Sequence, residues 1–341
     1  MKAVTRLFAP GVARQGAKAL GFALALQAVA AVACAAPTYT VVVSPGADLG
    51  TVTSAAAGDS VFRVDPTAGS VTQVSGSATR SANTSTRAMV TVSCAAQVAG
   101  DCAKTLNVRL GTVGSPTGRA RALTRLTFVM GTAQLAGGPG APGSASFTIG
   151  AVGANSSKTF FVGADLGVAG DDSGLPTGLA ESDFFAFVAE SPATPTAGGI
   201  GRFTATVIRS IAISKTSDLV FGTIAQPASG SGLVTIDPNS GARTTLGAVG
   251  LSSPTPSRAT FSITGEGGQA FSVSVPATFQ MNGPAPITVT TTSSVTGAPL
   301  LSGVLGSQGS FTLGVGGSAP INSTTPAGDY TGSFTVTVAY N

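Results

Sequence analysis

The segment GSFTVTVAY, residues 332–340, alternates between apolar and small side chains. Phe334, Val336, Val338 and Tyr340 occupy every second place, with threonine or alanine between them. Because successive side chains of a strand point to opposite faces, this pattern predicts a β-strand with one apolar face. Similar short runs rich in Val, Thr, Ile and Phe, separated by Gly, Pro, Asn and Asp, recur along the chain. The sequence therefore predicts an all-β sandwich fold.

Residues 1–35 have the pattern of a secretory signal peptide. A basic start with four Lys and Arg residues precedes an Ala-rich apolar run over residues 19–36, and residues 33–35 read Ala-Cys-Ala, which fits the small-x-small cleavage rule. A lipoprotein modified at Cys34 and a retained membrane anchor are alternatives. The lipoprotein signal normally has a Leu three residues before the Cys, which is missing here. The apolar run is also short for a membrane anchor. We expect an exported chain with no transmembrane span after cleavage.

The net charge changes when this segment is set aside. The chain has 18 basic and 14 acidic residues, and four of the basic ones lie in the segment, which leaves 14 of each sign. A neutral chain gives no reason to expect nucleic acid as a partner. Charged residues are 9% of the chain while apolar residues are 43%, so the composition is not that of a disordered protein.

An internal repeat divides the remaining residues into two copies of one pattern. Each copy has a strand, an Asp-Pro-x-x-Gly turn with Asp65 or Asp237, and, at a nearly equal distance, a strand that starts at Arg87 or Arg258. The matched segments are residues 61–70 with 234–243, 87–93 with 258–264, and 194–208 with 325–340. We therefore expect two tandem immunoglobulin-like sandwich domains.

The predicted boundaries place the first domain at residues 36–210 and the second at residues 211–341. The first domain is longer, and its extra length lies between about residues 112 and 191. It also contains Cys94 and Cys102, which are the only cysteines after Cys34. An even pair in an exported chain predicts a disulfide. A redox or metal pair is the alternative, but the spacing is not Cys-x-x-Cys.

The residue types that most enzymes need are scarce. The chain has no His, so a Ser-His-Asp or Cys-His nucleophile and an imidazole metal site are excluded. Asp165, Asp171 and Asp172 could hold calcium, but their spacing fits no common calcium loop, which favours a solvated loop. GEGGQ, residues 265–269, lies between two strands and lacks the Lys of a phosphate loop, so it predicts a hairpin turn. We predict no enzyme, catalytic residue, metal site or cofactor.

Three arginines could form a patch that binds anions. In residues 117–128, Arg119, Arg121 and Arg125 alternate with apolar residues, as on one face of a strand. A strand with a solvated polar face is the simpler interpretation. An acidic-glycan patch at Arg119, Arg121 and Arg125 is the sharper one.

The chain resembles chaperone–usher pilins at its C-terminus. Those subunits end in an alternating apolar strand with a penultimate aromatic residue and a glycine fourteen residues from the end, the places that Tyr340 and Gly328 occupy here. DPTAGSVTQVSGSATR (residues 65–80), followed by VTVSC and GDC, is similar to the opening of the spore coat protein U family, which includes archaic pilins. DLVFGTI (residues 218–224) and residues 325–341 are similar to a related secreted bacterial domain of unknown function.

The resemblance implies partners and an interaction strand. Gly328, Phe334, Val336, Val338 and Tyr340 would face a periplasmic chaperone and then a neighbouring subunit, because an incomplete sandwich offers an unpaired strand edge. An usher would assemble such subunits into a fimbria on the cell surface. A complete sandwich, whose last strand has no partner chain, is the alternative.

A donor strand is needed for such an assembly. Tyr39, Val41 and Val43 alternate near the predicted mature N-terminus, with Pro45 interrupting the pattern soon after. They could form a donor extension for the next subunit or the first strand of the first domain, and the sequence leaves this open.

Two surface roles follow for an exported structural protein. A donating N-terminus would make the chain a polymerising pilin, and a built-in one would make it a two-domain tip adhesin. In the second role the apolar loop over residues 133–146 could contact a surface or a glycan. We favour the adhesin because the domains differ in length and cysteine content. A self-complete secreted or coat protein without a chaperone or usher is the alternative.

Overall fold

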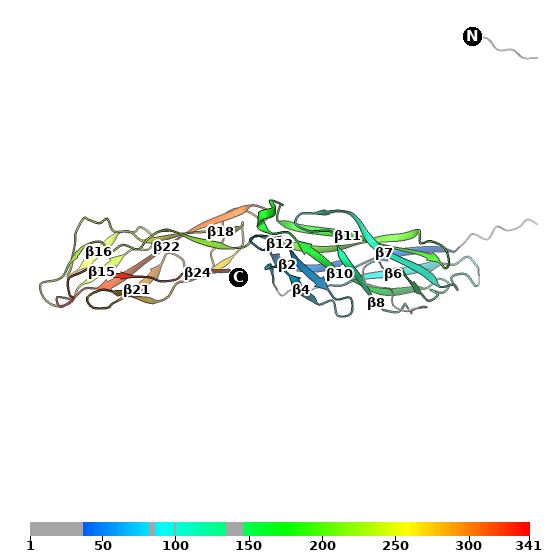
Figure 1. Ribbon diagram of the computed structural model, residues 1–341, viewed down its shortest axis with the longest axis horizontal. Coiled ribbons are helices and arrows are strands. Elements are labelled where there is room, and N and C mark those ends of the chain that lie inside the picture. The colour runs from blue at the N-terminus through cyan, green and yellow to red at the C-terminus, as the bar shows by residue number, and fades with distance from the viewer. Residues whose placement is uncertain (1–36, 82–85, 99, 134–145) are drawn as a thin grey trace, which may run out of the picture. The chain divides into compact units, whose positions relative to one another are not determined.

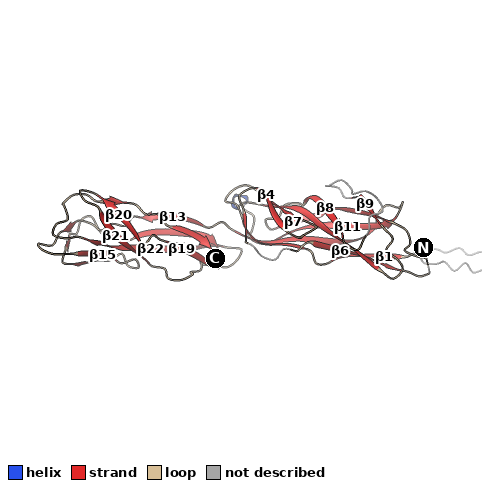
Figure 2. Ribbon diagram, turned by 90° about the horizontal axis from the view of Figure 1, so that it is seen from below, coloured by secondary structure: helices blue, strands red, loops and turns tan. Residues whose placement is uncertain are grey.

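The computed structural model describes residues 37–81, 86–98, 100–133 and 146–341, shown in Figure 1. These residues form strands joined by turns and loops, together with one 3-10 turn, η1 (Asp171–Ser173) (Figure 2). The fold is therefore all-β, as the alternation predicts. The expected signal peptide, residues 1–35 with Cys34, lies outside the described residues, as does most of the apolar loop over residues 133–146.

The N-terminal half of the described residues contains β1 to β12. These strands are β1 (Thr38–Val43), β2 (Ala47–Thr53), β3 (Ser60–Val64), β4 (Val71–Ser75), β5 (Thr79–Arg80), β6 (Ala88–Ala95), β7 (Leu106–Thr117), β8 (Thr124–Met130), β9 (Ser146–Ile149), β10 (Ser157–Val168), β11 (Gly178–Glu190) and β12 (Ala197–Ile208). They form two six-stranded sheets, β1-β6-β10-β3-β4 with β8 beside β10, and β5-β2-β12-β11-β7-β9. The two sheets pack around one buried cluster that includes Phe62, Phe160, Phe184 and Phe203.

A disulfide closes the hairpin between the two sheets of this half. Cys94 in β6 is bonded to Cys102, which precedes β7, and both side chains are buried in the same cluster. The predicted pairing of Cys94 with Cys102 is therefore present. The bond holds the end of β6 next to the start of β7, so it connects one sheet to the other.

The C-terminal half contains β13 to β24. These strands are β13 (Ala212–Ser217), β14 (Ile224–Ala225), β15 (Leu233–Ile236), β16 (Arg243–Leu246), β17 (Val249–Gly250), β18 (Ala259–Glu266), β19 (Phe271–Ser274), β20 (Thr278–Asn282), β21 (Ile287–Ser293), β22 (Gln308–Pro320), β23 (Thr331–Gly332) and β24 (Thr337–Tyr340). The main sheet has the order β13-β18-β22-β21-β20-β23, with β15 pairing β22 and β16 pairing β15. Two short ladders, β14-β17 and β19-β24, complete this half.

Strand pairings repeat between the two halves in the same order. The path β1-β6-β10-β3-β4 corresponds to the path β13-β18-β22-β15-β16. The pair β2-β5 corresponds to β14-β17, the pair β10-β8 to β22-β21, and the pair β11-β7 to β24-β19. In the described part of the chain, no ladder joins a strand of β1–β12 to one of β13–β24. A repeated strand arrangement is what the sequence repeat led us to expect.

The Asp-Pro turn shows the repeat at the level of single atoms. The Asp65 carboxylate accepts a hydrogen bond from the Thr67 amide, and that of Asp237 accepts one from the Asn239 amide. An arginine then holds each turn from the side, since Arg87 donates to the carbonyl oxygens of Pro66 and Thr67. Arg258 makes the equivalent bonds to Pro238 and Asn239. These bonds explain why the sequence keeps Asp and Arg at matching places.

Candidate subunit-interaction edge

The C-terminal strand lies at the edge of its ladder. β24 pairs antiparallel with β19, so that Tyr340 is opposite Phe271 and Val338 is opposite Val273. Val338, Tyr340 and the preceding Phe334 and Val336 pack against the cluster around Phe271. The alternation in this segment therefore does place one apolar face against a core, as the sequence predicts.

The second edge of β24 carries no strand in the described part of the chain. The Asn341 amide donates to the Ala270 carbonyl, which makes these two residues a hydrogen-bonded pair. Hydrogen-bonded and non-hydrogen-bonded pairs alternate along an antiparallel ladder, so Tyr340 and Val338 are in non-hydrogen-bonded pairs with β19. Their main-chain N–H and C=O groups consequently point away from β19, toward the open edge.

In the N-terminal half, the equivalent edge is paired with another strand. β11, the counterpart of β24, pairs with β7 on one side and with β12 on the other. β12 in turn pairs in parallel with β2, the counterpart of β14. The C-terminal half has counterparts for β2 and β11, but the described residues contain none for β12.

This comparison corrects one part of the sequence repeat. Residues 194–208 and 325–340 match in sequence, which suggested that β12 and β24 are equivalent. By its pairing, β24 takes the place of β11 instead. The error arises because alternation gives the face that a strand buries but not its neighbours in the sheet.

Incomplete burial marks both sides of the gap. In β11 the inward side chains of Phe184, Ala186 and Val188 are at most 1% exposed, whereas Phe334, Val336, Val338 and Tyr340 of the β24 segment are only partly buried. In β2, Leu49 and Val52 are 0% exposed. Their counterparts by the Asp65–Asp237 offset, Phe221 and Ile224, are only partly buried.

The hydroxyl of Tyr340 connects β24 to a buried carboxylate. It accepts a hydrogen bond of 2.7 Å from the Glu266 amide, and burial raises the pKa of Tyr340 above its ordinary value. The Glu266 carboxylate is fully buried and accepts hydrogen bonds from Thr177 Oγ1, the Gly306 amide, and both the amide and the guanidinium of Arg209. Sequence reasoning missed this residue because it treated GEGGQ only as a hairpin turn. A lone acid between two apolar strands was the available signal.

A second carboxylate holds the segment that joins the two halves. Asp171 Oδ2 accepts hydrogen bonds from the amide and hydroxyl of Ser210, at 3.1 and 2.6 Å. Its Oδ1 accepts from Ser54, at 2.7 Å, and from Arg119. Burial raises the pKa of Asp171, but the bonds from Ser210, Arg119 and Ser54 outweigh it and keep the pKa below its ordinary value.

The three arginines of the expected anion patch are not on one face. Arg119 is 2% exposed and bonded to Asp171, and Arg121 forms an ion pair of 2.9 Å with Asp59. Arg125 is exposed and has a left-handed backbone, with φ of 49°. β7 ends at Thr117 and β8 begins at Thr124, so a turn lies where the patch required a strand. The expectation of one strand face is therefore wrong.

The candidate donor residues are part of the N-terminal half. Tyr39, Val41 and Val43 lie in β1 and pair with β6, and Val41 is buried in the core. The Tyr39 hydroxyl donates to Glu190, and burial together with this bond raises the pKa of Tyr39 to about 12. After Pro45 the chain enters β2 in the other sheet. The interruption that weakened the donor pattern is thus a change of sheet.

Gly328 precedes β23 and has a φ of 152°. A side chain there would collide with the ring of Pro284, so the place requires glycine for a local reason.

The acids considered for calcium each have a protein partner. Asp165 pairs with Arg63, Asp171 with Arg119, and Asp172 accepts a bond from the Gly58 amide. No group of three or more potential metal-ligating side chains occurs in residues 37–341 outside the undescribed gaps. Likewise, no helix of the described residues is long and apolar enough to cross a membrane.

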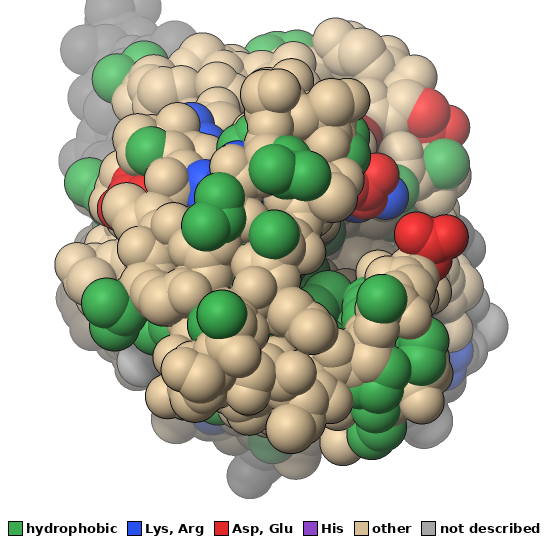
Figure 3. All heavy atoms as spheres, turned by 90° about the vertical axis from the view of Figure 1, so that its left-hand side faces the viewer, with side chains coloured by type: hydrophobic (Ala, Val, Ile, Leu, Met, Phe, Trp, Pro, Cys, Tyr) green, Lys and Arg blue, Asp and Glu red, His purple; other side chains and the backbone are tan. Residues whose placement is uncertain are grey.

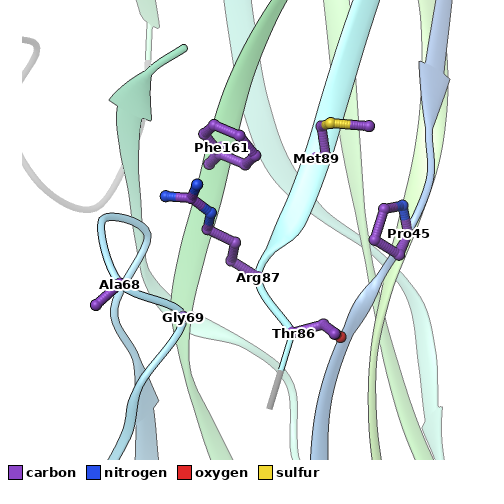
Figure 4. A pocket seen from close by; sticks show the side chains of 7 residues that line it. All are labelled: Pro45, Ala68, Gly69, Thr86, Arg87, Met89 and Phe161. Atoms are coloured by element: carbon purple, nitrogen blue, oxygen red, sulfur yellow. The ribbon is translucent and has the colours of Figure 1, made fainter. Parts of the chain in front are cut away.

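A hollow of about 310 Å³ beside Arg87 has a structural explanation (Figure 4). The Arg87 guanidinium lies 3.5 Å from the centre of the Phe161 ring and also holds the Asp65 turn. Met89 and Pro45 contribute the opposite wall. Arg87 therefore has a structural role beside this hollow, since Arg258 holds the second turn with the same bonds.

Few charges occur at the end of the C-terminal half where β15 and β16 lie. Figure 3 shows hydrophobic side chains dispersed among uncharged ones over this end. Leu246 and Val249 are 73% and 61% exposed. Val249 lies in β17, which pairs with β14.

Comparisons with known proteins give one family and distant structural likenesses. Residues 211–340 match a family described as a domain of unknown function, DUF4402. No curated protein sequence matches the chain. One similar structure is a chaperone–tip adhesin complex of CFA/I fimbriae, with 11% identity, a TM-score of 0.23, and coverage of 68% of this chain and 77% of that chain. Another is the CsuC–CsuE chaperone–tip adhesion subunit complex from archaic Csu pili of Acinetobacter baumannii, with 12% identity, a TM-score of 0.25, and coverage of 88% of this chain and 99% of that chain.

Proposed function

We propose that this chain is an exported surface subunit whose C-terminal half is completed by a strand from another protein. One observation carries the proposal: β24 and β14 have counterparts in β11 and β2, but no described strand corresponds to β12, which lies between those two. The C-terminal half thus has the strand arrangement of the N-terminal half, except that one strand position is unoccupied in the described residues. A β-strand is the occupant that satisfies both the unpaired main-chain groups and the half-buried apolar face.

The N-terminal half also indicates how the strand would run. β12 is antiparallel to β11 and parallel to β2. A donor strand in the equivalent place would therefore run antiparallel to β24 and parallel to β14. Its alternate side chains would cover Val336, Val338 and Tyr340, which are half-buried.

A receiving role fits the chain better than a donating one. Tyr39, Val41 and Val43 already pair with β6, so giving them to a neighbour would remove β1 from its sheet. We therefore propose a two-domain, tip-adhesin-like subunit, with a self-complete first domain up to about Ser210 and a strand-accepting second domain. A periplasmic chaperone and then another subunit would supply the strand, with an usher in assembly.

The alternative is a secreted or coat protein that remains stable with the edge open. Edge strands can be tolerated when they are short and flanked by polar side chains, and β24 is short. This alternative predicts a monomer that a donor strand does not stabilise.

The test is urea unfolding of the exported chain with and without a synthetic donor peptide of about eight alternating apolar and polar residues. We expect the unfolding midpoint of the C-terminal half to rise, because a hundredfold excess of peptide over Kd adds about 3 kcal/mol to its free energy of unfolding. A peptide with the alternation shifted by one residue is the control, because it places the wrong side chains inward.

Two substitutions on the same strand sharpen this test. Val338→Arg places a charge on the apolar face and should abolish the effect of the peptide. Thr337→Arg changes the exposed face of the same strand and should preserve it. An unfolding midpoint that no donor peptide raises would remove the proposed function.

A further inference from the structure

Two phenylalanines of β11 lie on the outer face of its sheet. Phe184, Ala186 and Val188 are fully buried, so the intervening Phe185 and Phe187 point away from the core. Their rings are 4.5 Å apart between centroids, with an angle of 30° between their planes. They form a pair of adjacent aromatic side chains, which we call the Phe185–Phe187 platform.

Glycines in the neighbouring strands let these rings lie low on the sheet. Gly111 of β7 is opposite Phe185, and Gly198 of β12 is opposite Phe187. A Cβ atom on Gly111 would collide with the Phe185 ring, and one on Gly198 with the Phe187 ring. The rings therefore occupy the space that side chains of the neighbouring strands would take. Ile200, which is opposite Phe185 on β12 and 61% exposed, extends the apolar surface.

A cation lies beside this platform without an acidic partner. Arg109 is opposite Phe187 on β7, and its guanidinium carbon is 5.6 Å from the centre of the Phe185 ring. Arg109 is exposed, and none of the ion pairs in the described residues includes it. The packing of the two rings over Gly111 and Gly198 explains the position of the rings. It does not account for Arg109, which lies next to them without an ion pair.

Arg109 also lines a groove of about 550 Å³ with both polar and apolar side chains. Asn107 shares its face of β7, while Ser146 and Thr148 of β9 are directly opposite Arg109 and Asn107. Residues 192–195, between β11 and β12, also line the groove, and the side-chain amide of Asn107 donates to the Ala193 carbonyl at 3.0 Å. The volume is in the range of sites that bind small ligands.

We propose that this groove and the Phe185–Phe187 platform bind a carboxylated pyranoside, such as a uronic acid or sialic acid unit. The apolar face of the sugar ring would stack on Phe185, whose ring face is weakly negative and attracts C–H groups. The sugar carboxylate would pair with the guanidinium of Arg109, which is shaped for bidentate contact. Asn107, Ser146 and Thr148 would meet the sugar hydroxyls.

The charges disfavour a nucleic acid in this place. A polyphosphate backbone needs several cations along its path. Here Arg109 is one cation, and the same sheet face carries Asp183 and Glu181 around Arg202. The inference deepens the proposed function and rests on it for the role of the ligand, but the binding itself does not involve β24.

The test is isothermal titration of the exported full-length chain with oligogalacturonate, a hyaluronan oligosaccharide and sialyllactose. We expect at least one to bind, and its methyl ester, which lacks the negative charge, to bind about tenfold more weakly. Arg109→Gln and Phe185→Leu should each weaken binding by about tenfold or more, because one removes the charge and the other the flat ring. Arg121→Gln is the matched control, since this exposed arginine pairs with Asp59 and does not line the groove.

The outcomes separate this inference from the proposed function. Binding that depends on both Arg109 and Phe185 supports it, whether or not a donor peptide stabilises the C-terminal half. The inference is wrong if none of the three saccharides binds, or if Arg109→Gln binds as well as the unchanged chain. Polyglutamate binding that Arg109→Gln abolishes and Phe185→Leu leaves intact would also contradict it, because that indicates an acidic peptide site. Unchanged urea midpoints for both variants verify that they fold.

Discussion

The carboxylate of Glu266 accepts four hydrogen bonds while its side chain is fully buried. Such a group is tolerated inside a protein only because each of its acceptor sites has a partner and Arg209 supplies a countercharge. Its own amide also donates to the Tyr340 hydroxyl. One residue therefore links β24 with Arg209, which precedes β13.

Glu266→Gln should destabilise the chain strongly. The substitution keeps the size of the side chain but leaves Arg209 without its countercharge, and breaking a buried pair typically costs about 3 to 5 kcal/mol. Urea unfolding measures the loss. Glu181→Gln, at the more exposed pair with Arg202, is the matched control and should cost less than about 1 kcal/mol. Equal effects of the two substitutions would show that the Glu266 pair is not the stronger constraint.

Asp171 should make stability depend on pH in the acid range. Its pKa is lowered in the folded chain, so the stability it contributes is present above the pKa of the unfolded chain, about 3.9. That contribution is lost as the pH falls through the lower, folded pKa. The stability difference between the unchanged chain and Asp171→Asn should therefore shrink between about pH 5 and about pH 2. Urea midpoints across this range measure it, and a difference that does not vary with pH would contradict the assignment.

At the scale of elements, the strands themselves could be predicted from the sequence. Alternation over residues 334–340 correctly indicates which face of β24 is apolar, and the Asp65 and Asp237 turns correctly indicate a repeated hairpin. These features follow from local rules that every strand and turn obeys. The pairing of Cys94 with Cys102 followed from cysteine number and the expectation of export.

The place of each strand in a sheet could not be predicted in the same way. β12 and β24 have similar sequences, yet one is paired on both edges and the other on one. That difference depends on which other segments are present, and no local pattern records it. The arginine patch failed for a related reason, since Gly118, with φ of 56°, turns the chain between Thr117 and Arg119. The Phe185–Phe187 platform was also missed, because residues 184–189 of its strand are all apolar and do not show which side chains point outward.

At the scale of the whole molecule, the same strand framework is used in two different ways. The N-terminal half has β12 between β11 and β2, and the inward side chains of β11 and β2 are buried. The C-terminal half lacks a described strand in that place, and the apolar side chains on both sides of the gap remain partly exposed. We infer that one half is self-sufficient and that the other depends on a partner. β12 in the N-terminal half thus shows the place and direction that a donated strand would take in the C-terminal half.

Hydrogen exchange at the amides of β11 and β24 tests this central claim most directly. In the free chain, the Val338 and Tyr340 amides face the open edge and should exchange quickly, while amides throughout β11, which is paired on both edges, should be protected. Adding the donor peptide should protect Val338 and Tyr340 and leave β11 unchanged. Slow exchange at Val338 in the free monomer would contradict the account, because it would show that the edge is already covered.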